Sequence, residues 1–315
     1  YAEAHWNYGL TLLTGGRFRE GWAEYDWRWK RGGSRRQDFG HPRREFSQPP
    51  WDGSPLDGKT ILLHAEQGLG DTIQFIRYGR LVADRGGRVV VECQPRLTRL
   101  LGTMPEIDHV VAKGDALPEF DVHAPLVDLP YLFDTDLETI PDTVPYLGPP
   151  PRDLIDLGHA DRRKIGIVWA GRPTHKNDKD RSVELGQFRP LLELTEFAFY
   201  SLQVGERRGD IYRLGLGDSL TDIGDEMTDF AVTACAVKQL DLLISVDTAP
   251  AHLAGALAQP VWTLLPFVPD WRWMREREDT PWYPTMRLFR QKSRGDWQGV
   301  FTDVGRALAR LASAP

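Results

Sequence analysis

The sequence predicts an α/β protein in which two Rossmann-like domains follow an α-helical hairpin. Apolar runs of strand length alternate with helical patterns through residues 58–291, as in parallel sheets that helices cover on both faces. Two of these runs end in turns that start helices, and open parallel sheets hold ligands at such turns. The length of 315 residues also exceeds what one hydrophobic core usually holds. We therefore expect one domain at residues 58–150 and another at residues 151–291.

Composition excludes several classes of protein. A formal net charge of −6 argues against a nucleic-acid-binding protein, and no apolar run reaches the roughly 20 residues that a transmembrane helix needs. The two cysteines, Cys93 and Cys235, form neither a disulfide framework nor a metal-ligand cluster, so we expect a reducing, cytoplasmic setting. The first residue is Tyr1 rather than Met, which indicates a piece of a longer protein.

Residues 1–30 predict a helical hairpin. Apolar and aromatic residues recur at helical spacing on both sides of a glycine turn at residues 15–16. With Phe18 and Tyr25 on the second helix, the segment resembles a tetratricopeptide repeat, which predicts the last member of a longer array. An isolated hairpin packed on the main body is the alternative. Residues 31–57 are rich in Arg, Gly, Pro and Gln and indicate a linker.

Each domain has its own series of strands. The first domain has expected strands at residues 59–65, 88–93, 109–111 and 120–124. The second has expected strands at residues 164–171, 197–202, 240–244 and 261–265, and a helix at residues 229–239. A proline-rich stretch at residues 141–151 indicates a stiff linker. An amphipathic helix within residues 292–315 is expected to return to the first domain and brace it.

The turn after the first strand has the sequence Glu-Gln-Gly-Leu-Gly-Asp at residues 66–71. Gly68 and Gly70 allow the backbone to approach a ligand closely, and Asp71 lies at the entrance of the next helix. Asp71 is either a helix cap or a general base that faces a substrate. The glycine spacing does not match the dinucleotide-binding pattern, so no nicotinamide or flavin site is expected.

A second turn, Ser-Val-Asp-Thr-Ala-Pro-Ala-His at residues 245–252, joins a buried strand to a helix of small residues. Asp247 or Thr248 would supply the N-cap oxygen, and the free N–H groups of the first helical turn would suit a diphosphate. A capped turn without a ligand is the alternative.

Gly70-Asp71 and the run at residues 245–254 together resemble the heptosyltransferase family of glycosyltransferases, family nine. With the hairpin in front and Trp-rich segments at residues 266–273 and 281–284, the chain resembles the C-terminal part of bacterial tetratricopeptide-repeat glycosyltransferases. The resemblance implies a two-domain GT-B fold and an inverting, metal-independent transfer of a sugar from a nucleotide-diphosphate donor, with no cofactor beyond that substrate. The implied acceptor is a protein or glycan hydroxyl that the repeats recruit. A non-catalytic repeat scaffold and a nucleotide-sugar epimerase are the alternatives.

The same resemblance implies roles for individual residues. The family's catalytic aspartate falls on Asp71, which would take the proton from the acceptor hydroxyl. Its donor-binding residues fall on Asp247, Thr248, Ala249 and His252. Ala249 replaces the usual glycine, which reduces the freedom for positive φ. His252 would either donate to a phosphate oxygen or pack against the sheet.

A basic loop at residues 172–182 resembles the family's phosphate-binding loop. A leaving diphosphate gains negative charge, which Lys or Arg must stabilise when no metal does. Arg181 matches the family's lysine best, and Lys176 or Lys179 would assist. A solvated charged loop is the alternative.

Further assignments rest on the resemblance alone. Glu206 would accept from the ribose hydroxyls and Met227 would lie against the nucleobase, although an exposed loop Glu and a core Met explain them equally well. The acceptor or sugar pocket would include Gln67, Gly70, Trp271, Arg272 and Trp282. Packing is the alternative role for the tryptophans.

Overall fold

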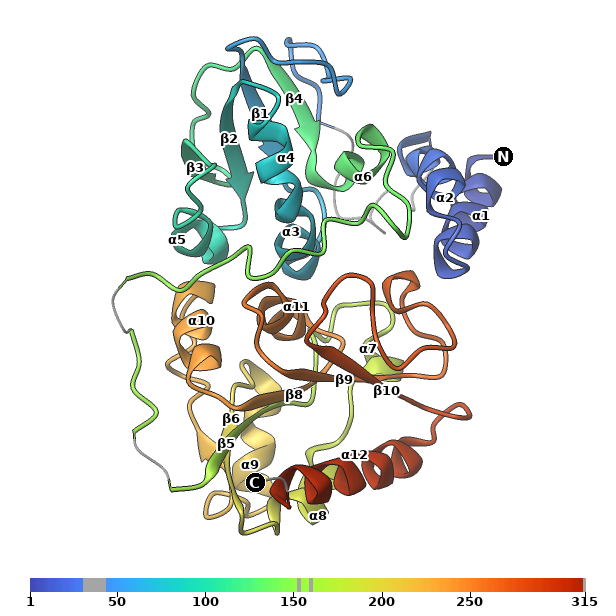
Figure 1. Ribbon diagram of the computed structural model, residues 1–315. Helices are drawn as coiled ribbons and strands as arrows, with labels where there is room; N and C mark the ends of the chain where they lie inside the picture. Colours follow the sequence, from blue (N-terminus) through green and yellow to red (C-terminus); the bar gives the residue numbers. More distant parts are fainter. Residues whose placement is uncertain (31–43, 152–153, 159–160, 314–315) are drawn as a thin grey trace. The chain divides into compact units, whose positions relative to one another are not determined.

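Two all-parallel sheets, one in each of two structural units, form the framework of the chain (Figure 1). The computed structural model describes residues 1–30, 44–151, 154–158 and 161–313. Unit 1 comprises Tyr1–Gly148 and Asp270–Arg275, and unit 2 comprises Pro149–Pro269 and Glu276–Pro315. The expected linker at residues 31–57 lies partly outside the described residues.

Unit 1 contains a helical hairpin and a four-stranded sheet in the order β3-β2-β1-β4. Its strands are β1 (Thr60–His64), β2 (Arg88–Cys93), β3 (His109–Ala112) and β4 (Val122–Pro125). Its helices are α1 (Ala2–Thr14), α2 (Phe18–Tyr25), α3 (Leu69–Phe75), α4 (Gly79–Ala83), α5 (Thr98–Leu101) and α6 (Leu129–Leu132). Every residue of β1 is buried, as expected for a central parallel strand with both faces covered.

The predicted hairpin is present as α1 and α2, and a glycine lets the two helices approach closely. A Cβ atom on Gly9 would lie 2.8 Å from the main-chain nitrogen of Tyr25, closer than real Cβ contacts come. On the other side of the hairpin, Trp22 of α2 packs edge-on against Phe75 of α3, with ring centroids 6.3 Å apart. The hairpin is therefore an integral part of unit 1. Its resemblance to a tetratricopeptide repeat stays a prediction.

A short stretch from the second half of the sequence, Asp270–Arg275, belongs to unit 1. We call it the crossover segment. The Trp271 ring meets those of Trp22 and Phe18 edge-on, at centroid distances of 5.2 and 6.4 Å, and the residue is only 4% exposed. Residues 151–291 therefore do not form one unit as expected, because this aromatic cluster holds the crossover segment in unit 1.

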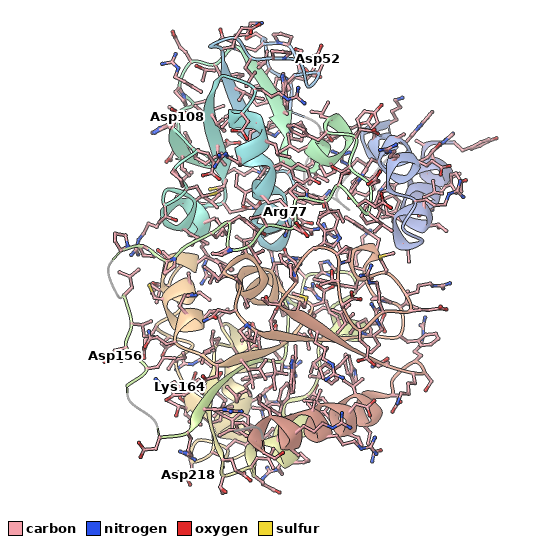
Figure 2. All side chains as sticks on the ribbon, in the orientation of Figure 1. Asp52, Arg77, Asp108, Asp156, Lys164 and Asp218 are labelled. Atoms are coloured by element: carbon pink, nitrogen blue, oxygen red, sulfur yellow. The ribbon has the colours of Figure 1, made fainter. Side chains whose placement is uncertain are left out.

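The first part of the proline-rich stretch packs on unit 1. Arg77, labelled in Figure 2, donates to the carbonyl oxygen of Pro141 at 3.0 Å and to the hydroxyl of Tyr146 at 3.1 Å. Tyr146 in turn donates to the carbonyl oxygen of Ile73 at 2.9 Å. Residues 141–146 are thus hydrogen-bonded to α3 and to the helical turn that follows it. The stretch up to Gly148 therefore belongs to unit 1.

Unit 2 contains a six-stranded sheet in the order β10-β9-β8-β5-β6-β7. Its strands are β5 (Arg163–Val168), β6 (Phe197–Ser201), β7 (Thr221–Asp222), β8 (Leu242–Val246), β9 (Val261–Leu265) and β10 (Met286–Arg290). Its helices are α7 (Asp178–Arg181), α8 (Arg189–Leu192), α9 (Asp210–Arg213), α10 (Phe230–Lys238), α11 (Ala249–Ala256) and α12 (Trp297–Ala312). Over the described part of the chain, no helix has the length and apolarity to cross a membrane.

Helix α12 packs into the core of unit 2. Its buried residues Val300, Val304 and Leu308 belong to one apolar cluster with residues of β5, β6 and β8, and Phe301 meets Phe188 with ring centroids 4.7 Å apart. The prediction that this helix returns to the first domain is therefore wrong. Its apolar stripe is real, but its partner is the core of unit 2.

Two strands of unit 2 were not predicted. β7 has only two residues, too few for a periodic signal. β10 has the sequence Met-Arg-Leu-Phe-Arg, in which Arg287 and Arg290 interrupt the apolar run. Its first three residues nevertheless alternate between buried and exposed. The strand lies at the edge of the sheet and pairs with β9.

We expect Gly9→Ala to destabilise the protein. Alanine favours a helix over glycine by about 1 kcal/mol, but the close approach of Tyr25 should outweigh this with an overpacking cost of roughly 1–3 kcal/mol. Chemical denaturation measures the difference. Gly217→Ala is the matched control, because among the described residues no atom beyond those of its two chain neighbours lies within 4 Å of its Cβ position. A Gly9→Ala protein as stable as the wild type would contradict the close packing of α1 on α2.

Candidate functional site

Asp71 lies in the first turn of α3, directly beyond the carboxyl end of β1. Its Oδ2 atom accepts a hydrogen bond from the main-chain N–H of Gly68 at 2.8 Å, so it does cap the helix. Its side chain is 21% exposed. Gly70 lies in the same helical turn, and neither Gly68 nor Gly70 has a positive φ.

The other carboxylate oxygen of Asp71 is paired with Arg272 of the crossover segment. Oδ1 accepts from Nη2 of Arg272, whose Nη1 donates to Asp270 at 2.7 Å and whose Nε donates to Gln74 at 2.5 Å. Arg272 is only 7% exposed. Burial alone would lower the pKa of its guanidinium, but Asp270 and Asp71 outweigh burial and raise that pKa. Arg272 is thus a fixed cation with carboxylate partners.

A second buried arginine joins the hairpin to the turn before α3. Nε of Arg28 donates to Glu66 at 3.0 Å, and Nη2 pairs with Asp128. Burial raises the pKa of the Glu66 carboxyl, and Arg28 opposes this shift. The ring of Trp29 lies under the guanidinium, 4.4 Å from its central carbon to the ring centroid.

Gln67 connects this region further. Its side-chain Nε2 donates to the hydroxyl of Tyr25 at 2.9 Å, and its main-chain carbonyl oxygen accepts from the side-chain amide of Gln94 at 2.8 Å. Burial raises the pKa of Tyr25 from 10.0 to about 12. Gln67 is therefore hydrogen-bonded to α2 and to a residue after β2. Its place in an acceptor or sugar pocket, which the family resemblance implies, stays a prediction.

In unit 2, the turn between β8 and α11 has the expected strand-to-helix form, with Thr248 as the N-cap residue. The Thr248 hydroxyl bonds to Ser245 and to the carbonyl oxygen of Val246 rather than to the helix. Pro250 has no N–H, and the N–H of Ala251 is donated to the carbonyl oxygen of Thr248 at 3.0 Å. The first helical turn thus offers fewer main-chain donors than expected. Ala249 has no positive φ, so the replacement of glycine causes no backbone strain.

His252 is buried on α11 and bonded to Tyr283. Its Nδ1 lies 2.9 Å from the Tyr283 hydroxyl, and its Nε2 lies 3.9 Å from Oδ1 of Asp247. A Cβ atom on Gly255 would meet the Tyr283 ring at 2.4 Å, so glycine at that position is what lets the tyrosine reach the histidine. This geometry fixes the imidazole ring beside Asp247.

Arg181 lies at the end of α7 and reaches the same turn. Its Nη1 donates to the main-chain carbonyl of Asp247 at 3.1 Å, and its Nε lies 3.5 Å from Asp178. A Cβ on Gly171 would lie 2.5 Å from the Arg181 guanidinium, so this glycine makes the space for it. Ser182 braces the loop by accepting from the N–H of Gly171 at 2.9 Å. The structure therefore brings the predicted cation and the predicted turn together.

The remaining predicted donor residues lie at other places in unit 2. Lys176 and Lys179 are exposed, on the loop before α7 and within α7 respectively. Glu206 is exposed beyond β6, and Met227 is 3% exposed between β7 and α10.

The two tryptophans that were expected to line the sugar or acceptor pocket are buried. Trp282 is completely buried in unit 2, and Trp271 is 4% exposed in unit 1. An indole with no exposed face offers nothing for a sugar to stack on. The packing alternative therefore holds for both tryptophans.

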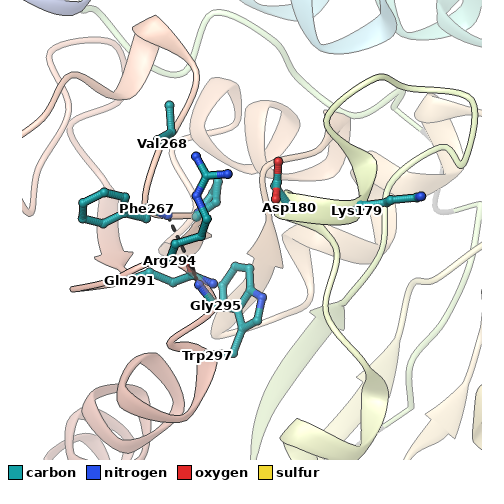
Figure 3. A pocket seen from close by; sticks show the side chains of 9 residues that line it. Lys179, Asp180, Phe267, Val268, Gln291, Arg294, Gly295 and Trp297 are labelled. Carbon is teal, nitrogen blue, oxygen red and sulfur yellow. Dashed lines mark hydrogen bonds between the residues drawn. The ribbon is translucent and has the colours of Figure 1, made fainter.

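A small pocket of about 100 Å³ lies beyond the carboxyl ends of β9 and β10 in unit 2 (Figure 3). Lys179 and Asp180 line one side, and Phe267, Arg294 and Trp297 line the others. The Gln291 amide oxygen accepts from the main-chain N–H groups of Phe267 and Gly295 at 3.2 and 2.9 Å. Within the described ranges, no three His, Cys, Asp or Glu side chains gather as metal ligands.

Sequence reasoning missed several residues that build these sites. Gly171, Asp178 and Ser182 hold Arg181 in place, and Arg28 and Glu66 fix the turn before α3. The available signal for Gly171 was a glycine as the last residue of the strand expected at residues 164–171. The Arg28 cluster had none, because its partners lie 38 and 100 residues away in sequence.

Comparison with known proteins gives one relative in sequence. No protein-family model matches the chain. Protein FlbA of Caulobacter vibrioides (strain ATCC 19089 / CIP 103742 / CB 15) is 27% identical over an alignment of 339 residues. The alignment covers 96% of this chain and 54% of FlbA, so the chain spans about half the length of that curated relative.

Solved glycosyltransferases share the fold. The family 9 glycosyl transferase from Veillonella parvula DSM 2008 is 12% identical with a TM-score of 0.54, covering 82% of this chain and 98% of its own. The E. coli ADP-heptose LPS heptosyltransferase II is 13% identical with a TM-score of 0.53, covering 81% and 100%. The dodecameric iron-containing heptosyltransferase TibC, solved with ADP-D-β-D-heptose, is 12% identical with a TM-score of 0.51, covering 80% and 67%. The chain therefore has the fold of glycosyltransferase family 9 structures, as the sequence resemblance implied.

We expect the stability of the protein to fall between about pH 10 and about pH 12, in part because of Tyr25. Its pKa is higher in the folded chain, so the unfolded chain loses this proton first and unfolding becomes easier as pH rises. The contribution is about 1.4 kcal/mol for each pH unit in this window. Denaturation of wild type and Tyr25→Phe across the window measures it, and the variant should show the shallower decline. Tyr131→Phe, at an exposed position, is the control. Equal slopes for wild type and Tyr25→Phe would contradict the assignment.

Proposed function

We propose that this chain is a glycosyltransferase that moves a sugar from a nucleoside diphosphate to an acceptor hydroxyl, with inversion at the anomeric carbon. The fold of family 9 glycosyltransferases supports the reaction class. The observation that carries the proposal is the Arg181 guanidinium, held against the carbonyl oxygen of Asp247 at the turn that starts α11. A fixed cation beside a helix N-terminus is well suited to a diphosphate.

The donor diphosphate would bind at this turn through side chains more than through main-chain N–H groups. Pro250 has no N–H and the N–H of Ala251 is already used, so Arg181 must supply much of the attraction. His252, fixed by Tyr283, and Thr248 would complete this side. Lys176 and Lys179 would add positive charge. Glu206 would accept from the ribose, and Met227 would contact the base.

Asp71 would act as the base in a single displacement. Its carboxylate takes the proton of the acceptor hydroxyl while the hydroxyl oxygen forms a bond to the anomeric carbon. The bond between that carbon and the diphosphate oxygen breaks, and the electron pair leaves with the nucleoside diphosphate. Arg181 stabilises the charge that develops there, the task a metal ion performs in other transferases. One displacement from the opposite face inverts the configuration.

The names of the structural neighbours make ADP-heptose the first donor to test, and UDP- and GDP-sugars are the further candidates. A hexosyl- or heptosyltransferase in the cytoplasm is consistent with the two buried free cysteines. The acceptor would be a hydroxyl on a protein or a surface glycan. Helical repeats of the tetratricopeptide type, of which α1 and α2 would be one, would recruit that acceptor.

We expect the protein to bind one nucleotide sugar and Arg181→Met to weaken that binding by about tenfold or more, since a charged hydrogen bond to phosphate contributes about 1.5–3 kcal/mol. Calorimetry with ADP-heptose, UDP-glucose and GDP-mannose, with and without EDTA, measures this. Arg189→Met, on an exposed stretch of α8, should bind as the wild type does. If none of these donors binds, the enzyme proposal fails.

We expect Asp71→Asn to reduce transfer by roughly a hundredfold or more while donor binding is retained, because the amide cannot take the proton. Release of the nucleoside diphosphate and NMR of the sugar product measure rate and anomeric configuration. Asp84→Asn, which changes an exposed ion pair with Arg80, is the control. An inactive wild type that binds the donor would indicate the scaffold alternative, and an altered free sugar would indicate the epimerase.

A further inference from the structure

Arg272 has no free side from which to bind a sugar. Its Nε, Nη1 and Nη2 groups have partners in Gln74, Asp270 and Asp71, and the residue is 7% exposed. Its guanidinium carbon also lies 4.5 Å from the Trp271 ring centroid and 5.7 Å from that of Phe75. All three nitrogen atoms of this guanidinium are hydrogen-bonded to protein groups, and two aromatic rings lie close to it. It is poorly placed to act on a ligand.

The effect on Asp71 is to fix both carboxylate oxygens. Oδ1 is held by Arg272, and Oδ2 is held by the N–H of Gly68 at 2.8 Å. Two hydrogen bonds on different oxygens define the plane of the carboxylate and its χ angles, which an aspartate near a helix start would otherwise vary. Each oxygen keeps a second lone pair, and the 21% exposure of the side chain leaves room for a hydroxyl to approach.

The charge of Arg272 is shared between two carboxylates. One guanidinium is shared between Asp71 and Asp270, so the three groups together retain one negative charge. A carboxylate paired alone with an arginine would be neutralised in full. Because Asp270 takes part of the cation, the pairing with Arg272 orients the Asp71 carboxylate without balancing its whole charge.

The position of Arg272 is itself fixed by its neighbours in the chain. Trp271 packs edge-on against both Trp22 and Phe18 of the hairpin, and the Asp270 side chain caps the short turn at 271–273 by accepting from the N–H of Arg272 at 3.1 Å. Met274 then leaves the turn with a φ of 54°. The crossover segment therefore presents Arg272 to α3 in one geometry.

We propose that Arg272 is a positioning residue that holds the Asp71 carboxylate in the orientation required for proton removal from the acceptor. This inference rests on the proposed glycosyltransferase reaction, in which the proton moves from the acceptor hydroxyl to Asp71. Arg272 does not contact the reacting atoms and acts only through Asp71.

The test compares wild type, Arg272→Met, Arg272→Lys, Asp71→Asn and the double variant Arg272→Met with Asp71→Asn. ADP release from ADP-heptose gives kcat and KM, and crystal structures of wild type and Arg272→Met give the orientation of Asp71. We expect Arg272→Met to lower kcat by on the order of a hundredfold with KM for ADP-heptose unchanged, because misplacement of a catalytic group costs rate rather than donor affinity. Arg272→Lys should recover part of the rate. Arg287→Met, which breaks an exposed pair with Glu278, is the matched control.

The double variant separates positioning from a general structural role. In the Asp71→Asn background, Arg272→Met should cause no further loss, since its effect passes through Asp71. An equal loss in both backgrounds, an unchanged kcat, or an Asp71 that keeps its orientation in crystals of Arg272→Met would each overturn the inference. If Arg272→Met does not fold, Arg272→Lys and Arg272→Gln answer the same questions. If wild type releases no ADP, the proposed function fails for this donor, and the crystal structures still show whether Arg272 holds Asp71.

Discussion

The buried guanidinium of Arg272 joins three stretches of chain that are distant in sequence. It binds Asp71 and Gln74 of α3, it binds Asp270 of the crossover segment, and it lies on Trp271, which packs on the hairpin. A buried cation is stable only while its carboxylate partners are present, and loss of one partner leaves an uncompensated charge. The local arrangement of the hairpin, the crossover segment and α3 therefore depends on this group.

The arginines of the two units differ in how much of their charge is already balanced. Arg272 and Arg28 each have two close carboxylate partners, so they serve to fix structure. Arg181 instead bonds to a main-chain carbonyl, and its nearest carboxylate, Asp178, lies 3.5 Å away. A carbonyl orients a guanidinium without cancelling its charge. Of these three arginines, Arg181 is thus the best able to attract an anion, and Gly171 provides the space in which it is held.

Much of the framework follows from local sequence patterns. The eight expected strands are present, because continuous apolar runs of strand length are a local signal for a covered parallel sheet. The helix expected at residues 229–239 is present as α10, with Asp229 as its N-cap residue. The location of the crossover segment could not be predicted, since its partners Trp22 and Asp71 lie about 250 and 200 residues away in sequence and no local pattern records them. For α12, the amphipathic pattern gave the buried face but not the core that receives it. The placement of Asp71 followed from the strand-to-helix turn, whereas its pairing with Arg272 did not.

The path of the chain through the two units has a consequence for protein engineering. The chain leaves unit 1 after Gly148, returns at Asp270 and leaves again after Arg275. A fragment that ends at Gly148 would lack Trp271 and Arg272, so it would expose an aromatic cavity and leave the Asp71 carboxylate without its cation. A chimera with a related protein must accordingly exchange the crossover segment together with the first 148 residues. In this chain, the module that can be inherited or transplanted is discontinuous, and its last six residues lie among those of unit 2 in the sequence.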